Sequence, residues 1–147
     1  MVQLQKLIDG FWEWAEVPQY LRKRELSRLP IEPSYYPNFN EMRKVCISLT
    51  NVNLTKDEIE NVLFCMALDD EEECILSYYK EHATDVFLTN LVSIGINFPQ
   101  RDARWQMAVL LQRPISGRKL FLEHLLVDED LYVRKRAKNT QDYITDR

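Results

Sequence analysis

The feature that most constrains this chain is a short pattern that recurs in three predicted helices. Each copy has an apolar residue, an arginine, two variable positions and then a small or apolar residue; the arginines are Arg43, Arg104 and Arg134. They lie 61 and 30 positions apart, which fits a repeat of about 30 residues with one copy between the first two. Glu73 stands where that copy should have its arginine, so the pattern fails there. A period of this size indicates helical hairpins stacked on one another.

Apolar residues recur at helical spacing along most of the chain. Only 3 of the 147 residues are glycine, and no stretch alternates strictly between apolar and polar residues. We therefore predict an all-α chain of about eight short helices, stacked as antiparallel hairpins in an α-solenoid or superhelical bundle. An irregular helical bundle with a chance motif is the alternative.

Capping residues indicate where several helices begin. Thr55 and Glu58 have the spacing of a capping box, and Asn38 with Glu41 gives the same spacing with asparagine in the capping position. Thr84 is predicted to cap a later helix. These starts place most of the helices between residue 38 and the C-terminus.

The length of the chain fits a single helical-repeat domain over residues 1–147. Residues 1–37 are atypical, with a helix predicted from 2 to about 17, a second from 19 to 29, and then a proline-rich loop. Tyr35 and Tyr36 lie in that loop, where they either bind a partner or cover the core. Residues 38–147 form the repeat-like hairpins.

The run from Arg101 to Thr140 carries the repeat pattern most clearly. Its defining residues are Leu122, Leu125, Leu126, Asp128, Asp130, Val133, Arg134 and Ala137, with Asp102, Ala103, Arg104 and Ala108 as a looser copy. This run resembles the HEAT-repeat superfamily over residues 100–140, and the likeness is weaker over 39–97. The resemblance implies that the acids Asp102 and Asp130 cap helices. It also implies that Arg104 and Arg134 pair across neighbouring repeats, and Arg43 belongs to the same pattern.

Composition and motifs argue against most kinds of chemistry. Proteins that bind nucleic acid carry a surplus of Lys and Arg to neutralise the phosphates, whereas this chain has a net charge of −4. The charge therefore argues against a nucleic-acid partner. The two histidines lack zinc-ligand spacing, and three glycines leave no room for a phosphate-binding loop. The three cysteines lie among apolar residues. We therefore expect no cofactor, no metal, no catalytic residues and no enzyme activity.

The chain also lacks the marks of export or membrane insertion. No charged segment precedes an apolar stretch at the N-terminus, and no apolar run approaches about 18 residues. We expect a cytoplasmic protein without a membrane partner.

Binding to a protein is the expectation that remains. Trp105 is predicted to face the surface, because Ala103, Met107 and Ala108 take the buried positions of its helix, and Arg101 lies one turn before it. The acidic run is predicted to begin a helix, where it either meets a basic partner or complements the helix dipole. Its members are Asp69, Asp70, Glu71, Glu72 and Glu73.

The most specific hypothesis is a bacterial immunity protein that binds and neutralises a toxin domain, since such proteins are often small, acidic and non-enzymatic. It rests on analogy of fold and composition. The alternatives are a HEAT-like DNA-binding enzyme of the alkylpurine DNA glycosylase type, with Trp105 and Asp102 as its candidate pair, and an adaptor or scaffold subunit.

Overall fold

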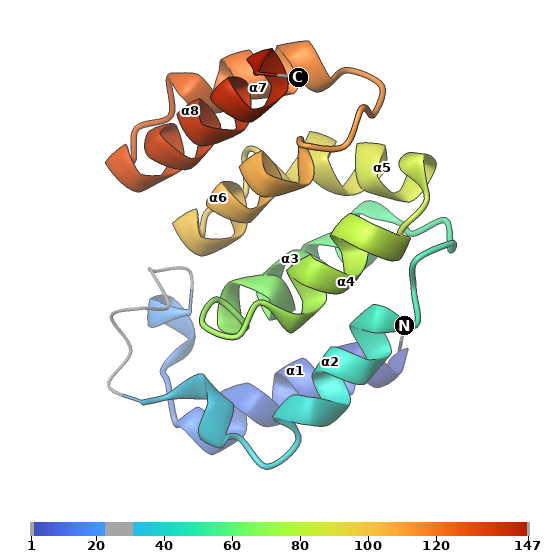
Figure 1. Cartoon of the computed structure of the whole chain (residues 1–147). Helices are drawn as coiled ribbons and strands as arrows, with labels where there is room; N and C mark the ends of the chain where they lie inside the picture. The colour runs from blue at the N-terminus through green and yellow to red at the C-terminus, as the bar shows by residue number, and fades with distance from the viewer. Residues whose placement is uncertain (1, 23–30, 147) are drawn as a thin grey trace.

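The computed structural model describes residues 2–22 and 31–146, whose regular secondary structure is all helical. The described residues form eight α-helices and no strand, and Figure 1 shows how these helices are arranged. The helices are α1 (Val2–Ala15), α2 (Phe39–Ile47), α3 (Lys56–Leu68), α4 (Cys74–His82), α5 (Asp85–Gly95), α6 (Arg101–Leu110), α7 (Arg118–Leu126) and α8 (Leu131–Thr145). The prediction of an all-α chain is confirmed.

The even-numbered helices follow one another through the molecule in chain order. Helix α4 packs against α2 and α6, and α6 packs against α8. Helix α3 packs against α1 and α5 and also reaches α6. Successive helix pairs therefore lie one above the next, from α1 and α2 at one end to α7 and α8 at the other (Figure 1).

Of the caps predicted at Thr55, Thr84 and Asn38, the first two are confirmed and the third is wrong. Thr55 and Glu58 form a complete capping box, with the Glu58 N–H donating to Thr55 Oγ1 at 3.2 Å and the Thr55 N–H donating to Glu58 Oε1 at 3.0 Å. Thr84 accepts from the Phe87 N–H at 3.2 Å. Asn38 precedes α2, but its side chain caps nothing, because its backbone (φ −99, ψ 19) lacks the extended conformation that aims a capping side chain at the helix.

The acidic run does not begin a helix as predicted. Asp69 ends α3, and α4 begins only at Cys74, after Glu73 adopts a left-handed backbone with φ 55. The Asp69 carboxylate reaches across this turn and accepts the Ile75 N–H at 3.0 Å. The turn also shifts the helix position at which the repeat arginine would stand. Arg104 and Arg134 are the fourth residues of α6 and α8, whereas the fourth residue of α4 is Ser77.

The N-terminal segment packs with the rest of the chain. Helix α1 contacts α2 and α3, and Tyr36 is buried against it, donating its hydroxyl to the Leu7 carbonyl at 3.0 Å. The second predicted helix, from 19 to 29, is a short 3-10 turn at its start (Gln19–Leu21), and residues 23–30 lie outside the described part of the chain. A second 3-10 turn, Pro33–Tyr35, leads toward α2.

Buried side-chain hydrogen bonds join even-numbered helices that pack against each other. The Tyr79 hydroxyl of α4 donates to the Cys46 carbonyl of α2 at 2.7 Å. Thr140 of α8 donates to the Ala108 carbonyl of α6 at 2.8 Å. Because these polar groups are removed from water, each bond must be made within the protein for the helices to pack in this arrangement.

We predict that Tyr79→Phe lowers the free energy of unfolding by about 1–2 kcal/mol, because it removes the buried bond between α4 and α2 while keeping the ring. Urea denaturation measures the change. Tyr78→Phe is the matched control, since the neighbouring hydroxyl is exposed and makes no hydrogen bond within the described residues. Equal stability of the two variants would contradict the prediction.

Candidate protein-binding surface on helices α6 and α8

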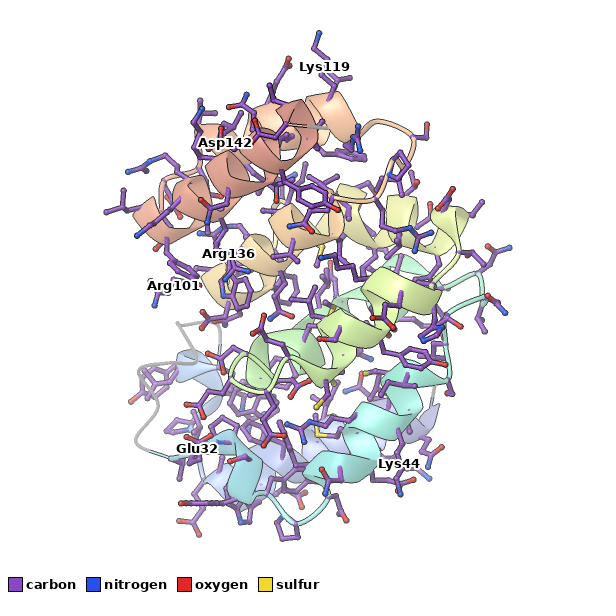
Figure 2. The ribbon with its side chains drawn as sticks, viewed as in Figure 1. Glu32, Lys44, Arg101, Lys119, Arg136 and Asp142 are labelled. Atoms are coloured by element: carbon purple, nitrogen blue, oxygen red, sulfur yellow. The ribbon has the colours of Figure 1, made fainter. Side chains whose placement is uncertain are left out.

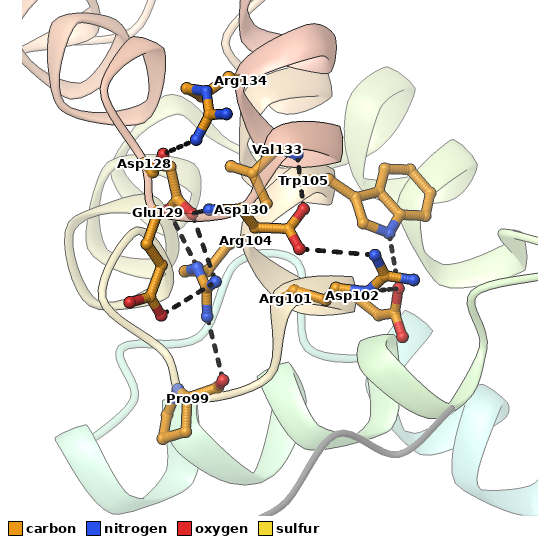
Figure 3. A network of polar contacts seen from close by, with 10 residues as sticks. All are labelled: Pro99, Arg101, Asp102, Arg104, Trp105, Asp128, Glu129, Asp130, Val133 and Arg134. Carbon is orange, nitrogen blue, oxygen red and sulfur yellow. Dashed lines mark hydrogen bonds and ion pairs between the residues drawn. The ribbon is translucent and has the colours of Figure 1, made fainter. Parts of the chain in front are cut away.

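A buried ion pair holds the turn before α8 against α6. The Arg104 residue is 6% exposed, and its guanidinium donates to both carboxylate oxygens of Asp128, at 3.0 and 3.3 Å (Figure 3). A further nitrogen donates to the carbonyls of Phe98 and Pro99, both at 3.0 Å. Bidentate pairing and the additional acceptors compensate for removing the two charges from water.

The turn that contains Asp128 is held from its other side by α8. The Arg134 guanidinium donates to the Asp128 carbonyl at 2.6 Å, and the Asp130 N–H donates to the Asp128 carboxylate at 2.9 Å. Asp130 caps α8 by accepting the Val133 N–H at 3.1 Å, which confirms the predicted cap. Residues 128–130 are thus fixed to both helices.

A second arginine–aspartate pair repeats this arrangement between α2 and the turn before α4. Arg43 of α2 lies 2.6 Å from a carboxylate oxygen of Asp69, in the turn before α4, and its Nε donates to the same oxygen at 2.9 Å. The two pairs have sequence separations of 26 and 24 residues. In each case an arginine of one even-numbered helix holds the aspartate in the turn that precedes the next.

Two roles implied by the resemblance differ in the structure. Asp102 caps no helix; it accepts the Trp105 indole N–H at 3.1 Å. Arg134 donates to the turn before its own helix, where it bonds to the Asp128 carbonyl.

The expectation that Trp105 faces the surface is wrong. Its side chain is buried, with 4% of the residue exposed. Nine of the ten residues of α6 are buried, from Asp102 to Leu110, because α3, α4, α5, α7 and α8 pack around this helix. A helix surrounded on all sides has no outward face for a tryptophan to occupy.

Two residues of α8 cover the Trp105 ring. The Arg136 guanidinium lies 4.6 Å from the ring centre, and the Tyr132 ring meets Trp105 edge-on at 5.7 Å. Arg136 also donates to the Tyr132 hydroxyl at 2.8 Å. Arg136 and Tyr132 are therefore held in place at the surface by a buried aromatic ring beneath them.

A groove of about 330 Å³ runs between α6 and α8 beside this cluster. It contains no acidic residue, and its two cations, Lys135 and Arg136, make no ion pair within the described residues. Its lining consists of Val109, Gln112, Tyr132, Lys135, Arg136, Asn139 and Thr140. We define these residues as the α6–α8 groove.

Arg101 lies at the same edge of the molecule as Arg136 (Figure 2). Its side chain is 37% exposed and lies 3.5 Å from Asp130 and 3.8 Å from Asp102. Burial works to raise the pKa of Asp130, but the Val133 N–H and the Arg101 guanidinium outweigh it, so the pKa lies below its usual value. Arg101 is therefore accessible but engaged with these acids.

The acidic run offers less free charge than its sequence suggests. Asp69 is buried against Arg43, and Glu72 is 64% exposed with an oxygen 3.4 Å from the same arginine. Asp70 is half-buried; its burial, together with the carboxylates of Asp102 and Glu71, raises its pKa to about 6. Glu71 is exposed and Glu73 is half-buried.

The two loop tyrosines have opposite environments. Tyr35 is 78% exposed, whereas Tyr36 is 6% exposed and bonded to α1. Tyr35 therefore stays available for binding, and Tyr36 covers the core.

No group of three or more side chains suited to hold a metal occurs in the described part of the chain. Within the same residues, no helix has the length and apolar character needed to cross a bilayer.

Sequence reasoning missed the α6–α8 groove, and it missed the equivalence of the two arginine–aspartate pairs. The recurrence of an arginine followed by an aspartate 24 to 26 residues later was the signal for those pairs. Tyr132 stands four residues before Arg136, the spacing that places two side chains on one helix face.

We predict that Asp128→Ala lowers the free energy of unfolding by about 3–5 kcal/mol, since it leaves Arg104 buried without its carboxylate. Denaturant titration measures the loss. Glu129→Ala is the matched control. The Glu129 side chain is 89% exposed, and its carboxylate oxygen lies 3.8 Å from an Arg104 nitrogen, too far for a hydrogen bond. This substitution should lower the free energy of unfolding by less than about 1 kcal/mol. A small effect of Asp128→Ala would mean that the pair does not hold the turn.

We predict that Asp70→Asn stabilises the protein near pH 7.5, because the native state pays to keep this carboxylate ionised above its pKa of about 6. As the pH falls through 6 toward the ordinary value of 3.8, the native carboxyl takes up its proton before the unfolded chain does. The advantage of the variant should therefore shrink by about pH 5.

Urea titrations of wild type and variant at the two pH values test this, with the exposed Asp57→Asn as control. An advantage of Asp70→Asn that is unchanged between them would contradict the raised pKa.

Comparison of the chain with protein-family models, curated proteins and solved structures finds no significant match.

Proposed function

We propose that this chain is a HEAT-like helical stack that acts as a non-enzymatic protein-binding module in the cytoplasm. In its most specific form it is a bacterial immunity protein that binds and neutralises a cognate toxin domain. The order of packing along the even-numbered helices supports the stack, and so do the pairs Arg43–Asp69 and Arg104–Asp128, which recur between successive hairpins.

The observation that carries the binding proposal is the cluster of Arg136 and Tyr132 over Trp105. Arginine, tyrosine and tryptophan are the residue types that dominate the energy of protein interfaces. Arg136 has no acidic partner within the described residues, although the chain carries more acids than cations. A partly desolvated arginine that the fold leaves without a carboxylate is suited to receive one from a partner.

The DNA-binding enzyme is less well supported. That reading needs an aromatic ring and an acid on an open surface, and its candidate pair is Trp105 with Asp102. Both residues are buried and bonded to each other, and Arg136 covers the tryptophan ring. A flipped base would find no free ring to stack on at this position.

We predict that the tagged protein, expressed in its native host, captures one partner in stoichiometric amount, and that this partner is encoded beside it. Expression of the partner alone should arrest growth, and co-expression of this chain should restore it. A protein that stays alone at micromolar concentration, or that fails to restore growth, would overturn the proposal.

The same preparation separates the alternatives. A strong, salt-sensitive shift of duplex DNA would favour the enzyme. A defined homo-oligomer in light scattering, without a captured partner, would favour the scaffold subunit.

A further inference from the structure

The α6–α8 groove has the geometry of a site for carboxylates. Its residues come from two packed helices and a turn, with Val109 on α6, Gln112 in the turn after it, and Tyr132, Lys135 and Asn139 on α8. Val109 is 8% exposed and gives the groove an apolar floor. Lys135 and Asn139 are exposed at its rim. Such a site combines an apolar base with polar and cationic groups around it.

The guanidinium at one end of the groove is oriented before any ligand arrives. Arg136 is stacked over Trp105, with its guanidinium carbon 5.7 Å from the Tyr132 ring centre, and one of its terminal nitrogens donates to the Tyr132 hydroxyl at 2.8 Å. Its Nε and other terminal nitrogen have no acceptor within the described residues. A planar fork held in one orientation loses little side-chain entropy when it binds a carboxylate through two hydrogen bonds.

We propose that the α6–α8 groove binds an acidic segment of the partner protein, with a carboxylate on Arg136 and a second on Lys135. The inference rests on the proposed protein-binding function and names the surface and the chemistry of its partner. Gln112 and Asn139 supply amide groups for the main chain of that segment.

Charge favours a protein segment over nucleic acid as the occupant. The groove supplies two cations, whereas phosphate backbones bind through many and gain affinity with each. Asp102 and Asp130 lie at the same edge, bonded to Trp105 and Arg101 respectively, and the whole chain has a net charge of −4. These acids oppose an extended polyanion but leave room for one or two carboxylates.

The test begins with the wild-type protein and a labelled glutamate-rich peptide, compared with a peptide that has glutamine at the same positions. Titration followed by amide NMR should shift signals of the groove residues with the acidic peptide only. Binding measured by fluorescence anisotropy should weaken as salt is raised, because the contact is between charges at the surface.

Two variants and a control locate the contact. Arg136→Gln should weaken binding of the acidic peptide about tenfold, and Arg136→Lys should recover only part of it, because an ammonium lacks the planar fork. Lys119→Gln should have no effect: this lysine is exposed on α7, far from Arg136 (Figure 2). Thermal melts of each variant confirm folding.

Three outcomes would overturn the groove: no binding of the acidic peptide, equal binding of the glutamine peptide, or tighter binding of a single-stranded oligonucleotide than of the peptide. If a captured native partner binds Arg136→Gln as tightly as wild type, the groove is wrong while the protein-binding function stands. If the peptide binds in the groove but the host yields no partner, the immunity function is wrong while the groove stands.

Discussion

The structure depends on the buried pair between Arg104 and Asp128. Arg104 lies in α6, the helix that nearly all the others contact, and Asp128 lies in the turn that leads into α8. The Arg104 guanidinium also donates to the carbonyls of Phe98 and Pro99, so this one side chain fixes the start of its own helix, α6, and the turn that leads into α8. Removing water from both charges is costly, and only complete pairing makes that cost acceptable. The pair thus acts as a constraint on geometry: α8 can begin only where Asp128 meets Arg104.

The sequence predicts well what depends on local chemistry. Helical spacing of apolar residues and the caps at Thr55, Thr84 and Asp130 can be read from neighbouring residues, and the structure contains them. The prediction that Trp105 is exposed is wrong because its exposure depends on how many helices surround α6, which no local sequence pattern records. Asn38 has a suitable side chain but the wrong backbone conformation, and the acids from Asp69 to Glu73 form a turn because Asp69 is drawn to Arg43, 26 residues away.

Two groups of charged residues in the described part of the chain have different physical roles. Those in the first group, such as Arg43, Arg104 and Asp69, are buried or nearly so, and their ion pairs join α2 to the turn before α4 and α6 to the turn before α8. Those in the second lie at the edge where α6 and α8 begin, where Arg101 faces Asp130 while Arg136 rests on an aromatic ring. The structural role of a buried ion pair is sufficient to account for it. The site therefore has to be sought among the charges that the fold does not need.

Arg136 meets that criterion in a way that Arg101 does not. Stacking on Trp105 holds the guanidinium at the surface, but a methionine or leucine would cover the same ring without placing a charge there. In a chain with 23 acidic and 19 basic residues, acids are available to pair with every exposed arginine, yet the groove beside Arg136 contains none. Leaving a guanidinium without a carboxylate gains nothing for folding. Its oriented and unused donors are better explained by a contact that forms only when another molecule supplies the acid.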